Sequence, residues 1–107
     1  MATGLQSAAT PYDKPMEDEH RKILRESRQA LVEDMEPQMV LRQMIDPHLF
    51  TEDEKDRIMA NNLTRQQQNE RLLDILPRKG ARAYEVFKET IKKAHPPLLT
   101  ILVEAGK

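Results

Sequence analysis

Residues 72–87 read LLDILPRKGARAYEVF, and this stretch decides the fold. Leucines at helical spacing precede Pro77, and the aromatic residues Tyr84 and Phe87 resume that spacing farther along. Pro77 and Gly80 both disfavour a continuous helix, so the stretch predicts two amphipathic helices joined by a short turn. Helices of this length are unstable alone in water, so each apolar stripe must pack against other helices.

The same period extends toward the N-terminus and predicts two more helices. Apolar side chains recur at three- and four-residue steps over residues 16–35, and we expect Asp18 to be the N-cap of that helix. A second helix is expected over residues 37–45, because Pro37 breaks the first helix and suits the first turn of the next.

Two capping boxes and a proline pair indicate where the remaining helices begin. Thr51 begins a T-x-x-E box and Thr64 begins a T-x-x-Q box, and both patterns satisfy the free N–H groups of a helix start. The Pro96–Pro97 pair can open a last helix that ends at Gly106. The sequence therefore predicts six short helices and no strand, in an all-α bundle. The residues expected in its core are Leu31, Leu72, Leu73, Leu76, Tyr84, Phe87 and Leu102.

Length and composition limit the possible functions. The chain has 107 residues with 17 basic and 18 acidic side chains, so its net charge of -1 argues against a dedicated polyanion binder. It has no cysteine, which excludes disulfides and thiolate chemistry. Residues 1–15 are small and polar without a helical period, so we expect a disordered N-terminal extension ahead of a domain over residues 16–107. No apolar run approaches membrane-spanning length, and the N-terminus does not have the pattern of a signal peptide.

The side chains that usually carry catalysis or bind metal do not form a recognisable pattern. His20, His48 and His95 lie on different segments, whereas zinc needs four ligands close together. The acidic run at residues 52–56 lacks the order and the glycine of a calcium-binding loop, and it suits a helix start. No nucleotide-binding or nucleophile motif is present. We therefore expect no catalytic residue, no metal site and no cofactor.

Charge is unevenly distributed along the chain. Residues 17–56 contain twelve acidic and six basic side chains, whereas residues 57–107 contain five acidic and ten basic ones. Within the first part, the exposed side of the first helix is basic, and the third helix is acidic. One basic and one acidic surface on a small domain favour head-to-tail association between copies or relatives.

Three stretches resemble caspase recruitment domains (CARDs), closest in pattern to those of initiator-caspase prodomains and their CARD adaptors. Glu19–Met35 is similar to a basic, leucine-bearing first helix, and Leu49–Glu54 is similar to the loop into the third helix. Leu72–Phe87 is the most specific match, with its proline-basic-glycine turn followed by paired aromatic residues. The resemblance covers about residues 17–105. It implies a six-helix antiparallel Greek-key bundle of the death-fold superfamily that binds other CARD-containing proteins.

The resemblance also implies where partners bind. In the commonest CARD contact, a basic surface from the first and fourth helices meets an acidic surface from the second and third helices of a neighbour. One departure weakens the basic surface, because Gln66 and Glu70 stand where some caspase members place arginine. The basic candidates are Arg21, Arg25, Arg28, Arg65 and Arg71. The acidic candidates are Asp34, Glu36, Glu52, Asp53 and Asp56.

The expected function is the recruitment or clustering of a caspase zymogen, an adaptor or an oligomerising sensor in cytoplasmic apoptotic or inflammatory signalling. Self-association is a second form of the same contact. A decoy that caps assemblies is equally consistent with the sequence. The alternative from another class is a helical nucleic-acid-binding or regulatory adaptor domain that uses the basic residues between Arg78 and Lys93.

Overall fold

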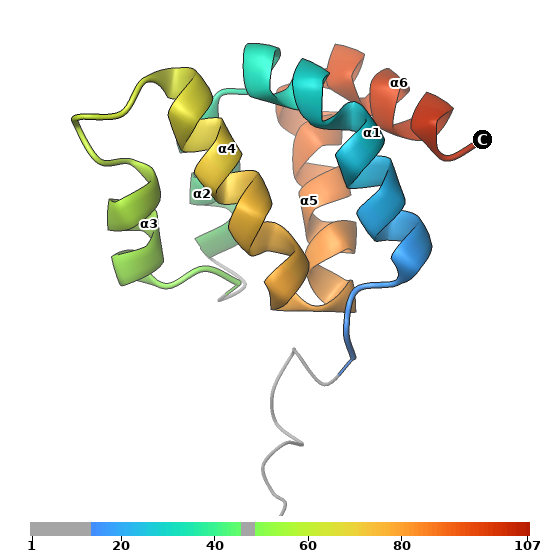
Figure 1. Ribbon diagram of the computed structural model, residues 1–107, viewed down its shortest axis with the longest axis horizontal. Coiled ribbons are helices and arrows are strands. Elements are labelled where there is room, and N and C mark those ends of the chain that lie inside the picture. Colours follow the sequence, from blue (N-terminus) through green and yellow to red (C-terminus); the bar gives the residue numbers. More distant parts are fainter. Residues whose placement is uncertain (1–13, 46–48) are drawn as a thin grey trace, which may run out of the picture.

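A computed structural model of the chain describes residues 14–45 and 49–107, and its regular elements within those ranges are all helical (Figure 1). Their number and order confirm the predicted all-α architecture. The elements are α1 (Asp18–Asp34), α2 (Pro37–Ile45), α3 (Glu52–Ile58), α4 (Arg65–Ile75), the short 3-10 helix η2 (Leu76–Lys79), α5 (Ala81–Ala94) and α6 (Pro96–Ala105).

The helices pack in pairs around one core. α1 contacts α4 and α6, and α5 contacts α2 and α6, so helices distant in sequence lie side by side. α4 also contacts α2 and α3, and α3 lies at the edge of the bundle beside α4 (Figure 1). This arrangement buries the apolar stripe of each helix, which none of them could do alone.

The core consists of aliphatic, methionine and aromatic side chains. All seven residues predicted for it are buried, and Phe87, Leu31, Leu72, Leu76 and Leu102 are almost completely inaccessible. Sequence periodicity did not identify Met16, Leu49 and Phe50, which are also buried although they precede helices. These three side chains attach the segments ahead of α1 and α3 to the bundle.

The helix starts follow the predicted local signals, with one exception. The Thr51 hydroxyl accepts a hydrogen bond from the Glu54 N–H at 3.0 Å, and the Thr64 hydroxyl accepts one from the Gln67 N–H at 3.1 Å. Both capping boxes are complete. The expectation for Asp18 is wrong. Asp18 is the first helical residue of α1, and Glu17 occupies the N-cap position.

The turn predicted between Leu72 and Phe87 is a short 3-10 helix instead of an open loop. α4 continues directly into η2, with Pro77 in its first turn, where a proline without an N–H is tolerated. Gly80 then adopts a φ of 92°, which L side chains rarely adopt, and this lets α5 start at the next residue. The N–H of Ala81 donates to the carbonyl of Lys14 at 3.0 Å, so the segment ahead of α1 contacts the start of α5. The N-terminal extension expected to be disordered covers residues 1–15. Its residues 1–13 lie outside the described ranges, whereas Lys14 makes this contact with Ala81.

The C-terminal end of α1 depends on α4. The last turn of α1 contains no basic residue, although a helix C-terminus favours positive charge. The buried Asn69 side chain of α4 donates to the carbonyls of Val32 at 2.9 Å and Met35 at 2.8 Å. A longer contact of 3.4 Å reaches the carbonyl of Leu31. Asn69 therefore satisfies acceptors that a helix end leaves free.

The histidines occupy three different environments. His20 stacks on Tyr84 with ring centroids 4.0 Å apart, and burial together with nearby carboxylates raises the pKa of the Tyr84 hydroxyl. His95, between α5 and α6, accepts a hydrogen bond from the Glu36 N–H at 3.1 Å. His48 lies outside the described residues.

Candidate protein interface

The basic candidates of α1 lie along its contact with α4. A groove of about 470 Å³ between the two helices is lined by Arg25, Arg28 and Val32 from α1 and by Gln66 and Glu70 from α4. Arg25 is exposed and makes no hydrogen bond or ion pair with any residue that the structure describes. Its charge is therefore available to a partner.

Arg28 is partly neutralised within the molecule. Its guanidinium pairs with the Asp74 carboxylate at 3.0 Å and donates to the Glu70 carbonyl at 3.4 Å. Both side chains of the pair are exposed, at 39% and 63%, so the pair contributes at most about 1 kcal/mol. A partner carboxylate can compete for this arginine at small cost.

Arg21 and Arg71 donate to backbone carbonyls of their own molecule. The Arg21 guanidinium reaches the carbonyls of Met16 at 3.1 Å and Pro77 at 3.4 Å, and that of Arg71 reaches the Arg57 carbonyl at 3.3 Å. These contacts leave the positive charges in place but fix the direction of each side chain.

Arg65 lies at the end of α1 beside Glu36, and not on a basic surface separate from the acidic one. It donates to the carbonyls of Glu33 at 2.8 Å and Met35 at 3.1 Å, and so it joins Asn69 at the end of α1. Its guanidinium is also 3.8 Å from the Glu36 carboxylate. The resemblance assigned Arg65 and Glu36 to opposite surfaces, so the two surfaces meet at this point instead of being fully separate.

The acidic candidates differ in how far they are neutralised. Glu52 pairs with Lys55 at 3.6 Å and Asp53 pairs with Arg57 at 2.7 Å, both within α3. These are exposed pairs of the kind that stabilise an isolated helix only slightly. Asp34 and Asp56 are exposed and form no ion pair within the described part of the chain.

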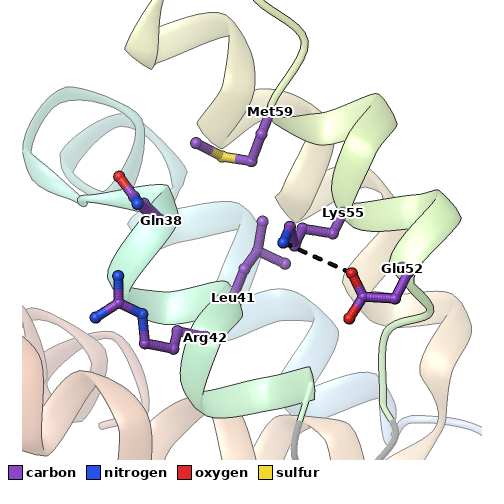
Figure 2. A pocket seen from close by; sticks show the side chains of 6 residues that line it. All are labelled: Gln38, Leu41, Arg42, Glu52, Lys55 and Met59. Carbon is purple, nitrogen blue, oxygen red and sulfur yellow. Dashed lines mark ion pairs between the residues drawn. The ribbon is translucent and has the colours of Figure 1, made fainter.

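A second groove, of about 460 Å³, separates α2 from α3 (Figure 2). Leu41 and Met59 line it beside the Lys55–Glu52 pair. Arg42 of α2 also lines this groove, with its guanidinium pointing away from Glu52 and Lys55, on a surface that the sequence had predicted to be acidic. The sequence carried a signal for this residue, because Arg42 is the single lysine or arginine between residues 29 and 54.

Comparison with protein-family models matches residues 21–104 to the caspase recruitment domain. The chain belongs to the CARD family. Comparison with curated proteins found no match. CARDs are interaction modules of the death-fold superfamily that bind other CARD-containing proteins, so the six helices form the bundle that the resemblance implied.

In this CARD, one partly buried ion pair positions α3. Lys79 of η2 and Glu54 of α3 pair at 2.5 Å, with their side chains only 12% and 23% exposed, and the Lys79 ammonium lies 5.5 Å from the centre of the Phe50 ring. Burial raises the pKa of the Glu54 carboxyl, but hydrogen bonds from Lys79 and Thr51 outweigh it, and the pKa is lowered overall. The pair therefore fixes the helix that carries Asp53 and the other exposed carboxylates.

The described residues of this CARD show neither a metal cluster nor a membrane span. In residues 14–45 and 49–107, no three histidine, cysteine, aspartate or glutamate side chains are placed to hold a metal ion together. Each helix in those ranges is too short or too polar to cross a bilayer.

Proposed function

We propose that this CARD recruits or clusters a caspase zymogen, an adaptor or an oligomerising sensor in cytoplasmic apoptotic or inflammatory signalling. Its basic α1–α4 surface, defined by Arg25 and Arg28, docks on the acidic surface of a neighbouring CARD. Its own acidic surface, defined by Asp53 and Asp56 of α3, accepts the basic surface of another. The observation that supports this proposal is the exposure of these four charges on the helices that CARDs use for contact.

The energy of such a contact comes from many weak interactions. One exposed ion pair contributes at most about 1 kcal/mol. Complementary surfaces raise the rate of encounter and select the partner, and repeated contacts in an oligomer add strength through multivalency. An attached effector would be brought close to other copies without any chemistry in the CARD itself.

Charge reversal tests the proposal. Arg25→Glu reverses a charge without breaking an internal pair, and Asp53→Arg reverses a charge of the acidic surface while breaking only the exposed pair with Arg57. We expect each variant to lose binding to CARD partners in pull-down and light scattering, with the circular dichroism spectrum unchanged. Lys92→Glu, an exposed reversal on α5, is the matched control and should bind normally. Normal binding by both Arg25→Glu and Asp53→Arg would refute the proposed surfaces.

The nucleic-acid alternative gains no support from the arrangement of the residues between Arg78 and Lys93. Lys79 is nearly buried and pairs with Glu54, so it does not extend a basic surface. A groove beside α5 places Glu85 and Glu89 among its basic side chains, which interrupts the positive potential that phosphate binding needs. We therefore do not propose this function.

A further inference from the structure

Two acids line the groove of the basic surface, Glu33 of α1 and Glu70 of α4. Glu70 lies on α4 opposite Arg25 and Arg28 of α1, and its neighbours there include the uncharged side chains Gln29 and Gln66. Glu70 is exposed, and its carboxylate forms no ion pair with the residues that the structure describes. Arg28 contacts only the backbone carbonyl of Glu70, because its charge pairs with Asp74 instead.

Arg42 has the complementary position on the acidic surface. It lies on α2, in the groove shared with Glu52 and Lys55 of α3, and is exposed (Figure 2). Lys55 already pairs with Glu52, whereas Arg42 forms no ion pair within the described ranges. Within the described residues, Arg42 is therefore an unpaired positive charge beside the acidic candidates of α3, and Glu70 is an unpaired negative charge beside Arg25 and Arg28.

We propose that Glu70 of one copy pairs with Arg42 of the next copy, as an inverted charge pair inside an otherwise plus-to-minus contact. This inference rests on the proposed docking of the α1–α4 surface on the α2–α3 surface, and it names the occupant, which is a second copy of this chain.

Glu70 and Arg42 can discriminate between partners by charge. A Glu70 carboxylate facing a uniformly acidic surface would meet only like charge, and like-charge contacts strongly disfavour a complex. A partner with a basic side chain at that point avoids the repulsion and gains a pair. Arg42 provides that side chain in this chain itself, so the two residues favour self-recognition and reject CARDs with an uninterrupted acidic surface.

Single and double reversals test the pairing in the full chain. We expect Glu70→Arg and Arg42→Glu each to raise the dissociation constant for self-association by roughly ten- to hundredfold, measured by light scattering and sedimentation at low salt. The chain that carries both substitutions should regain association to within about threefold of the original. Glu89→Arg, an exposed acid of α5, is the control and should leave the constant unchanged.

A mixing experiment does not depend on the stability of a double variant. Chains with Glu70→Arg and chains with Arg42→Glu associate poorly alone but present matched grooves to each other, so their mixture should associate. Failure of both the mixture and the double variant to recover would overturn the pairing. An unaltered chain that stays monomeric to its solubility limit, and binds only other CARDs, would overturn self-recognition.

The outcomes also separate this inference from the proposed function. If Arg25→Glu and Asp53→Arg abolish association while Glu70→Arg and Arg42→Glu do not change it, the surfaces are correct and the inverted pair is wrong. If none of the four reversals changes association, the proposed docking itself is refuted.

Discussion

Replacing Asn69 by alanine should destabilise this CARD more than any other single change of a polar side chain on α4. The Asn69 amide is fully buried and donates two short hydrogen bonds to carbonyls at the end of α1. Alanine removes the donor to the Val32 carbonyl and leaves the Met35 carbonyl with Arg65 alone, and α1 itself has no basic side chain in its last turn to compensate. The substitution therefore tests whether α4 holds the end of α1.

The magnitude follows from the hydrogen bonds. Each one contributes about 1 kcal/mol net, and a buried acceptor left unsatisfied costs about 1–3 kcal/mol. The Asn69 carbonyl oxygen accepts no hydrogen bond in the described part of the chain, and its removal offsets some of the loss. We expect a net cost of about 2–4 kcal/mol, which corresponds to a fall in Tm of roughly 10–25 °C for a domain of this size.

Urea unfolding followed by circular dichroism measures the effect. Gln66→Ala removes an exposed amide from the same helix and should change the free energy of unfolding by no more than about 0.5 kcal/mol. Arg65 and Asn69 both donate to the Met35 carbonyl. The changes in unfolding free energy caused by Arg65→Ala and Asn69→Ala should therefore not be additive. A loss for Asn69→Ala no larger than that for Gln66→Ala would refute the reasoning.

Three further outcomes follow from the fold. Phe87→Ala should cost about 3–5 kcal/mol in urea unfolding because the ring is completely buried, and a cost under 1 kcal/mol would contradict its place in the core. Since the pKa of Glu54 is lowered in the folded state, its contribution is present above the ordinary value of 4.5 and is lost as the pH falls through the lowered value. Glu54→Gln should therefore destabilise at neutral pH and progressively less as the pH falls below 4.5. A difference that does not change with pH would rule out an ionised Glu54 paired with Lys79. Thr64→Ala should cost about 1 kcal/mol and Thr64→Ser should restore it, because the hydroxyl caps α4; equal stabilities would contradict that role.

The features of the fold that depend on local chemistry were predictable from the sequence. Both threonine capping boxes and the α2 boundaries at Pro37 and Ile45 match the structure, since they rest on residues within one turn. The buried Leu49 and Phe50 were not predicted, because a two-residue apolar segment has no period and is buried only by tertiary contacts. Local patterns therefore define the helices, whereas long-range packing determines how the connections are buried.

The candidate interface was less predictable because a side chain's partner depends on tertiary neighbours. The sequence marks Arg28 and Arg65 as basic, but it does not show that Asp74 neutralises the first or that the second donates to the end of α1. The resemblance assigned the acidic surface to carboxylates at the end of α1, just before α2 and on α3, so it gave no role to Arg42 of α2. The position of Arg42 in a groove depends on how α2 and α3 pack together, which the sequence does not show.

The hydrogen bond between the Lys14 carbonyl and the Ala81 N–H has a consequence for proteolytic trimming. A protease that removed every residue before Met16 would spare the helices but take away the acceptor for the first N–H of α5, next to the glycine with positive φ. The trimmed chain should therefore exchange the Ala81 amide hydrogen faster than the intact chain. The shortest fragment that keeps this amide protected begins at residue 14.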